Sequence, residues 1–156
     1  MIIWFTGQPG SGKTTLAKLL FSYLKDHDED LKILNIDGDG IRDVFKNYDY
    51  SKAGRLKNIS NAQTVARFLD SKNYIVIVSL VSPYKWQREE LKATNKVLEV
   101  YLSTTEIRGR EDYHVTDYEP PTEHFLALDT GSLTPDACVY KIVEQLRFEE
   151  YPLSDL

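Results

Sequence analysis

Eight consecutive residues near the N-terminus have the types and the spacing of a phosphate-binding loop. They match the pattern G-x-x-x-x-G-K-[ST] in full and read Gly7, Gln8, Pro9, Gly10, Ser11, Gly12, Lys13 and Thr14. Glycines let the backbone wrap a phosphate closely, and the helix expected to start near Lys13 adds its positive end at the same place. We therefore expect an ATP site, with Lys13 on the β- and γ-phosphates, the Thr14 hydroxyl on Mg²⁺ and Thr15 beside it. The alternative is a Gly-rich turn with a lysine next to it.

Two carboxylates could serve the acceptor side of a phosphoryl transfer. Asp37 and Asp39 follow the second expected strand, and the usual winding of a parallel sheet would place them next to the phosphate loop. One of them could accept the proton of an acceptor hydroxyl or hold the metal through water, and we favour Asp39 as the base. The alternative is that both cap the following turn. The third expected strand ends in Ser79 without an acidic residue, so metal binding falls to Thr14 and this pair.

A long polar stretch from Ser103 to Glu123 separates the last two expected strands and has no apolar period. Loops of this length inside a compact domain are uncommon, and they often form lids or binding loops. Arg108 and Arg110 lie in it, and either one could bring positive charge to the transition state. We therefore expect a short lid at about residues 103–123, with a plain surface excursion as the alternative.

Alternating apolar segments predict the scaffold that must position these groups. Five strands are expected at residues 2–6, 31–36, 74–80, 97–102 and 124–128. Helices are expected at about 13–25 and 84–93, after Ser51 as N-cap, and after Thr134 as N-cap with Pro135 in the first turn. The pattern predicts an α/β fold, a three-layer sandwich of the P-loop kinase type around a five-stranded parallel sheet. We expect a single domain over residues 1–156.

Composition narrows the class of protein further. The 156 residues carry 19 Lys and Arg against 24 Asp and Glu, a net charge of -5, which counts against a non-specific nucleic-acid binder. The single Cys138 lies in an apolar helical pattern and is expected to be a small core residue. No segment approaches the roughly 20 apolar residues of a membrane span, and the N-terminus runs directly into a strand. We expect a cytoplasmic protein without a membrane partner.

Several further segments together resemble the adenylylsulfate kinase (APS kinase) family. They occur in that family's order and extend over nearly the whole chain: Ile36 to Arg42, Gly54 to Ile59, Val81 to Tyr84 with Arg88, Asp117 to Pro121, and Leu128 to Thr130. The resemblance implies transfer of the γ-phosphate of ATP, with Mg²⁺, to the ribose 3′-hydroxyl of adenylyl sulfate. The product would be the sulfate donor PAPS.

The resemblance also implies roles for individual residues. Asp39 would stand near the acceptor hydroxyl, and Thr130 would lie beside the nucleotide. Arg42, Arg55 and Asn58 would hold the phosphosulfate end of the substrate, and Phe45 would make a further substrate contact. Ser82, Pro83 and Tyr84 would form the wall of the site after the third strand. Arg55 and Asn58 are three residues apart, so they share a helix face and can meet one anion. The alternative for this pair is a solvated helix face.

Three departures from the family pattern keep the acceptor open. Gly40 stands where the family has Asn, and Ser60 where it usually has another arginine. The lid is much shorter than in the family, with Arg108 and Arg110 as the cations between Leu102 and Tyr118. A P-loop kinase of another acceptor, such as a nucleoside, a modified nucleobase or a nucleic-acid end, therefore remains an alternative. So does an ATP-binding module without catalysis, and either could form a homodimer.

Overall fold

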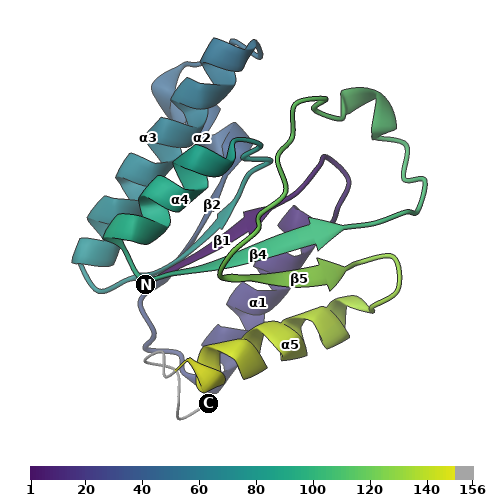
Figure 1. Cartoon of the computed structure of the whole chain (residues 1–156). Helices are drawn as coiled ribbons and strands as arrows, with labels where there is room; N and C mark the ends of the chain where they lie inside the picture. The colour runs from purple at the N-terminus through teal and green to yellow at the C-terminus, as the bar shows by residue number, and fades with distance from the viewer. Residues whose placement is uncertain (150–156) are drawn as a thin grey trace.

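The protein is a parallel β-sheet covered by helices on both faces, as a computed structural model of the chain shows; it describes residues 1–149 (Figure 1). The strands are β1 (Ile2–Thr6), β2 (Ile33–Asp37), β3 (Ile75–Ser79), β4 (Val97–Ser103) and β5 (Phe125–Asp129). The helices are α1 (Lys13–His27), α2 (Gly38–Phe45), α3 (Lys52–Ser71), α4 (Lys85–Thr94) and α5 (Pro135–Phe148), with a short 3₁₀ helix η1 (Glu111–Tyr113). The five-stranded parallel sheet that the sequence predicts is confirmed.

The two faces of the sheet form two separate apolar cores. Side chains alternate along a strand, so Ile3 and Phe5 of β1 enter one core with α1 and α5. Ile2 and Trp4 enter the other core, with α3 and α4. Cys138 is fully buried in the first core, as its apolar pattern predicts. Burial on both faces explains why these strands read as continuous apolar runs.

The strand order is β2-β3-β1-β4-β5, and every neighbouring pair is parallel. The central strand β1 therefore lies between β3 and β4. We expected Asp37, at the end of β2, to lie next to the phosphate loop that follows β1. That expectation is wrong by one strand, because β3 occupies the place beside β1 and β2 forms the edge of the sheet.

Helix α2 is absent from the sequence-based expectation. It begins directly at the end of β2, where the Asp37 side chain accepts a hydrogen bond from the backbone N–H of Gly40 at 2.6 Å. Two glycines in its first turn weaken the helical pattern in the sequence, since glycine is a poor helix former. The Asp37 cap supplies what the pattern lacks.

The two N-caps predicted from the sequence are confirmed. Ser51 accepts a hydrogen bond from the N–H of Gly54 at the start of α3, and Thr134 accepts one from Ala137 at the start of α5. Both helices thus begin where a side chain satisfies a free backbone donor. None of the helices within residues 1–149 combines the length and the apolar content of a membrane span.

Candidate active site

The phosphate-binding loop runs from the end of β1 to the first residue of α1, at the carboxyl end of the sheet (Figure 1). Gly10 and Gly12 have φ values of 81° and 103°, in the left-handed region that glycine adopts without strain. No acidic residue lies in the first turn of α1, so the positive end of this helix is not neutralised by its own side chains. The loop therefore has the backbone of an anion site.

Lys13 lies across the loop. Its Nζ donates to the carbonyl oxygens of Gly7 at 2.9 Å and Gln8 at 2.8 Å. Burial and, as a smaller second cause, the positive charge of Arg110 together lower the pKa of Lys13 from its ordinary value to about 8. An anion bound beside Lys13 would favour the charged ammonium and raise this pKa again, which is a property expected of a phosphate-binding lysine.

The candidate metal ligand and the candidate base are both accessible. The side chains of Thr14 and Thr15 are exposed in the first turn of α1. Asp39 is exposed in the first turn of α2, and its carboxylate has no hydrogen bond within residues 1–149. The carboxylate of Asp37, in contrast, caps the helix. The capping interpretation is therefore correct for Asp37, while Asp39 is left available for a ligand.

Arg42 is buried and anchors the loop that follows α2. Its Nη1 donates to the carbonyl oxygens of Asn47 at 3.0 Å and Asp49 at 2.9 Å. Its guanidinium also lies over the ring of Tyr50, 4.2 Å from the ring centroid. The sequence singled out Arg42 as an anion-binding residue, and the structure adds this contact with the loop. Phe45, at the end of α2, is 44% exposed.

Arg55 and Tyr84, which are 29 residues apart in sequence, meet at the side of α3. The Nε and Nη2 atoms of Arg55 donate to the Tyr84 hydroxyl at 3.3 Å and 3.1 Å. Asp117 lies 3.6 Å from the same guanidinium. The solvated-face alternative is wrong for this residue, because Arg55 is part of a contact between α3, the loop before α4 and the 103–123 segment.

Asn58 lies one turn further along α3 and faces the start of α2. Its Nδ2 donates to the carbonyl oxygen of Gly38 at 3.3 Å. Its Oδ1 is buried and has no hydrogen-bond partner within the described residues. An unpaired buried acceptor costs free energy, so it calls for an explanation, and a donor from a bound ligand is one. The solvated-face alternative is therefore wrong for Asn58 as well.

The wall after β3 presents its residues unequally. The Ser82 hydroxyl is buried and accepts a hydrogen bond from Trp4 Nε1 at 2.7 Å, with Ser82 itself at a positive φ of 42°. This side chain is therefore committed to the core. Pro83 and Tyr84 are also buried, and the carbonyl oxygen of Pro83 accepts from the N–H of Glu119 at 2.8 Å.

The 103–123 segment arches over the carboxyl ends of the strands and contacts the phosphate loop (Figure 1). The Gln8 side chain donates to the carbonyl oxygen of Val115 and accepts from its N–H, both at 2.8 Å. Tyr118 places its hydroxyl 2.8 Å from that of Thr6, and burial raises the pKa of this phenol above its ordinary value. The segment thus packs on the loop at more than one point, which is unlike a free surface excursion.

The two arginines of this segment differ. Arg108 donates to the carbonyl oxygen of Gly10 at 3.0 Å and to Thr130, at 2.8 Å to its carbonyl oxygen and 3.2 Å to its hydroxyl. The Thr130 hydroxyl in turn donates to the carbonyl oxygen of Ser11 at 2.7 Å. Arg110 is exposed, and its guanidinium lies 5.4 Å from the ring centroid of Tyr113.

A cavity of about 240 Å³ opens beside the phosphate loop. It lies between the start of α1, the loop after β5 and the start of α5. Its lining mixes apolar and polar side chains and consists of Gly12, Thr15, Leu16, Arg108, Thr130, Leu133, Pro135 and Cys138. Cavities of this kind, mostly apolar with a few polar groups, are typical of small-molecule sites.

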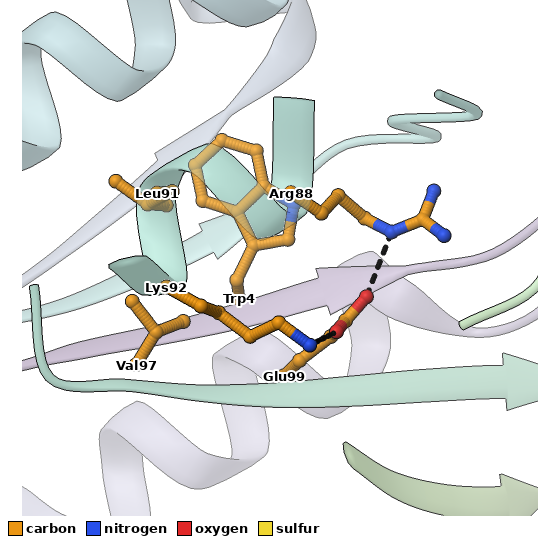
Figure 2. A pocket seen from close by; sticks show the side chains of 6 residues that line it. All are labelled: Trp4, Arg88, Leu91, Lys92, Val97 and Glu99. Atoms are coloured by element: carbon orange, nitrogen blue, oxygen red, sulfur yellow. Dashed lines mark hydrogen bonds and ion pairs between the residues drawn. The ribbon is translucent and has the colours of Figure 1, made fainter. Parts of the chain in front are cut away.

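Sequence reasoning missed a buried ion cluster behind the wall. Glu99 of β4 lies between Arg88 Nε at 2.7 Å and Lys92 Nζ at 2.6 Å, and Figure 2 shows the two cations of α4 converging on it. The space among these side chains and Trp4 is filled by the ion pairs, so it is no ligand cavity. A glutamate in the middle of an otherwise apolar strand was the signal that could have revealed the cluster.

A family model described as adenylylsulphate kinase matches residues 1–115. The chain belongs to the adenylylsulfate kinase family. It is therefore a phosphotransferase with an alcohol group as acceptor. It is 31% identical to the adenylyl-sulfate kinase of Pseudomonas entomophila, over 92% of this chain and 79% of the relative. It is 34% identical to a probable adenylyl-sulfate kinase of Pyrococcus abyssi, over 86% of this chain and 87% of the relative.

Solved structures of adenylylsulfate kinases share the fold. The hexameric APS kinase from Thiobacillus denitrificans superimposes with a TM-score of 0.78 at 28% identity, over 96% of this chain and 29% of that one. The Mycobacterium tuberculosis APS kinase, in complex with AMPPNP and APS, gives a TM-score of 0.80 over 94% of this chain and 96% of that one. Its identity is 21%, so this second likeness supports the fold alone.

Proposed function

We propose that this protein transfers the γ-phosphate of ATP to the 3′-hydroxyl of adenylyl sulfate, giving PAPS and ADP. One observation carries the acceptor half of this proposal. The start of α2, where the carboxylate of Asp39 is free, lies against Asn58, whose buried Oδ1 has no partner. Arg55 lies one turn before Asn58 on α3 and donates to the hydroxyl of Tyr84, the residue before α4. A carboxylate at the start of α2 and an amide acceptor and a guanidinium on the neighbouring helix α3 are the groups that a substrate with a hydroxyl and an anionic end would require.

The donor half follows from the phosphate loop. The backbone N–H groups between Gly7 and Thr14 and the start of α1 would hold the phosphates, with Gln8, Pro9 and Ser11 shaping the turn. Lys13 would leave its carbonyl partners for the β- and γ-phosphates. The nucleobase of ATP would occupy the cavity of about 240 Å³ beside Thr15 and Thr130.

The residues at the loop fit a magnesium ion bound together with the nucleotide. Mg²⁺ in kinases keeps several waters and takes few protein ligands, usually oxygens. The exposed Thr14 hydroxyl offers one such oxygen, and the second oxygen of Asp37 and the carboxylate of Asp39 could reach the ion through water. No group of three or more His, Cys, Asp or Glu side chains that could hold a metal ion occurs within residues 1–149. When bound, Mg²⁺ neutralises charge on the phosphate oxygens.

The transfer step assigns one role to each group. A bond forms between the 3′-oxygen and the γ-phosphorus while the bond from this phosphorus to the bridging oxygen of ADP breaks. The hydroxyl proton passes to the Asp39 carboxylate, which acts as the base. Arg42, Arg55 and the amide nitrogen of Asn58 would hold the phosphosulfate end, while Oδ1 of Asn58 would accept from a donor group of the substrate. Phe45 would add an apolar contact, and the backbone of Ser82 and Pro83 with Tyr84 would form the wall.

A different hydroxyl acceptor is the second candidate function. The observation that favours it is the short segment between β4 and Tyr118, which covers less of the acceptor than the family's longer lid would. A bulkier alcohol, such as a nucleoside, a modified nucleobase or a nucleic-acid end, would find room there. The net charge of -5 weighs against the nucleic-acid version.

ADP release by the purified full chain tests the proposal directly. Mg-ATP is supplied with adenylyl sulfate, with a panel of other alcohols, or with DNA or RNA ends. We expect stimulation by adenylyl sulfate alone and formation of PAPS, and we expect Lys13→Ala to lose it while keeping its circular dichroism spectrum. If only another alcohol stimulates ADP release, that alcohol and not adenylyl sulfate is the acceptor. Binding of ATP without any stimulation would make the protein a nucleotide-binding module.

A further inference from the structure

We infer that the two arginines of the 103–123 segment have separate tasks, with Arg110 contacting the transferring γ-phosphoryl group and Arg108 positioning the segment on the nucleotide site. Arg110 would be a catalytic residue and Arg108 a positioning residue. The inference rests on the proposed kinase function but not on the identity of the acceptor, because it concerns the ATP side of the reaction.

Both arginines stand over the same point of the phosphate loop. A side-chain carbon added at Gly10 would lie 3.1 Å from Cβ of Arg110 and 3.8 Å from Cβ of Arg108. The two side chains therefore start from one place and diverge. Gly109 between them has a φ of 79°, a turn that lets neighbouring residues point in different directions.

The guanidinium of Arg108 is already engaged with protein oxygens. It donates to Gly10, to both oxygens of Thr130 and, through Nε and Nη2, to the carboxylate of Glu106 at 3.1 Å and 2.9 Å. It also lines the cavity beside the loop. Its charge is neutralised by Glu106, and it lies beside the cavity proposed for the nucleobase. Moving it to a phosphate would break these hydrogen bonds, so we assign it the task of holding the segment in position.

The guanidinium of Arg110 is free for an anion. It is exposed and has neither a hydrogen bond nor an ion pair within the part of the chain that the structure describes. Its contact is the face of Tyr113, which holds a cation without using its N–H donors.

Arg110 also stands near enough to Lys13 for its charge to act on that ammonium. Lys13 makes no ion pair within residues 1–149 either. Two cations that approach one another without a carboxylate between them repel, and an anion placed between them removes the repulsion. Lys13 belongs to the phosphate loop, so the anion that fits this pair is the terminal phosphate of ATP.

The chemistry needs positive charge at this place. As the bond between the γ-phosphorus and the bridging oxygen breaks and the bond to the acceptor oxygen forms, negative charge spreads over the phosphoryl oxygens. A guanidinium that is already in position stabilises this charge more than it stabilises the ground state. Its five N–H donors suit phosphoryl oxygens better than an ammonium does.

Calorimetric titration of the full chain separates the two tasks without any acceptor. The ligands are MgADP and the magnesium complex of AMP-PNP, which differ in the γ-phosphoryl group. Arg110→Gln should weaken AMP-PNP binding by roughly tenfold, as expected for one lost charge-assisted hydrogen bond, and change MgADP binding less than twofold. Arg108→Gln should weaken both ligands by the same factor. Arg147→Gln, an exposed arginine near the end of α5, is the matched control and should change neither.

Turnover then tests the catalytic role. Arg110→Gln should lower kcat/KM by about 10²-fold or more, beyond its effect on AMP-PNP binding, because the contact strengthens in the transition state. Arg110→Lys keeps the charge and should recover part of the loss.

Equal losses for both ligands in Arg110→Gln, or no loss for either, would overturn the inference, and so would a γ-selective loss in Arg108→Gln. If adenylyl sulfate does not stimulate the wild type but the γ-selective loss appears, the inference stands and the proposed acceptor fails.

Discussion

Lys13 has a largely buried ammonium group, and the nearby positive charge of Arg110 acts on it. Both effects favour the neutral amine, and burial is the larger of the two, so the pKa falls from its ordinary value to about 8. A kinase lysine must be charged to attract phosphate. The residue that the sequence identifies most clearly is therefore poised to lose its charge within an accessible pH range.

We predict that kcat/KM for ATP falls as pH rises through about 8, because this parameter reports ionisation in the free enzyme. The bound polyphosphate raises the pKa of Lys13 again, so kcat should hold to a higher pH. A pH–rate profile checks both statements. Arg110→Gln should move the break upward, since it removes one of the two causes, and an unmoved break would contradict the contact between them.

The same shift has a defined sign for stability. The pKa of Lys13 in the folded protein is lower than in the unfolded chain, so the buried charge opposes folding below about pH 8. This opposition fades as the pH rises from about 8 toward the ordinary value of 10.5. Urea denaturation of the wild type and of Lys13→Met over this range should show the difference between them shrinking.

Asp39 differs from Asp37 in one respect that decides its role, which is that its carboxylate is not used by the fold. We predict that Asp39→Asn lowers kcat by about 10²- to 10⁴-fold, the usual contribution of a general base, with little change in the Kd of AMP-PNP. Steady-state kinetics and calorimetry give the two values. A loss confined to nucleotide affinity would make Asp39 a metal-holding residue instead.

At the scale of elements, the buried cluster around Glu99 joins parts that are far apart in the chain. Arg88 of α4 donates to Glu99 of β4, to the carbonyl oxygen of Ser82 and to that of Glu119. Lys92 donates to Glu99 and to the carbonyl oxygen of Glu123. One cluster therefore holds the wall after β3 and the returning end of the 103–123 segment against the same strand.

We predict that Arg88→Met lowers the free energy of unfolding by about 3 kcal/mol, because it removes a partner from a buried charge and two hydrogen bonds to carbonyl groups. Thermal and urea denaturation measure the change. The double variant Arg88→Met with Glu99→Leu should recover part of it, since no unpaired carboxylate then remains and Lys92 keeps its ion pair with Glu89. A single-variant loss below about 1 kcal/mol would show that water reaches the cluster.

At the scale of the whole molecule, the order β2-β3-β1-β4-β5 places the phosphate loop at the centre of the sheet and the Asp39 helix toward one edge. The 103–123 segment bridges this distance, because it contacts Gln8 near its middle and Arg55 and Pro83 near its end. A nucleotide bound under it would engage α1, the segment and the start of α5 together. Binding should therefore stabilise the entire domain.

We predict that the magnesium complex of AMP-PNP at about 100 times its Kd adds about 2.7 kcal/mol to the free energy of unfolding. For a domain of this size that raises Tm by roughly 5 to 10 °C. Lys13→Ala should lose most of this increase and keep the Tm of the unliganded protein. An equal increase in the variant would place the nucleotide elsewhere.

Homodimer formation also stays a prediction, and sedimentation of the full chain would measure it.

Much of the fold could be read from neighbouring residues. The five strands, the helix starts at Ser51 and Thr134 and the burial of Cys138 depend on periodicity and capping, which act over a few residues. Helix α2 was not predicted, because the signal for its start is the side chain of Asp37. The same side chain could equally have been a catalytic group. The position of β3 between Asp37 and the phosphate loop was not predicted, because strand order is not a local property.

The phosphate loop from Gly7 to Thr14, the alternating α/β scaffold and the family follow from the sequence alone, because each rests on residues that are close together in the chain or in a characteristic order. Which residue of the pairs Asp37 and Asp39, and Arg108 and Arg110, stays free for chemistry is known only from the folded structure. Asp37 caps a helix whereas Asp39 is available, and Arg108 bonds Gly10 and Thr130 whereas Arg110 is available. Such choices depend on partners tens of residues away, and only the packed chain brings those partners within hydrogen-bonding distance.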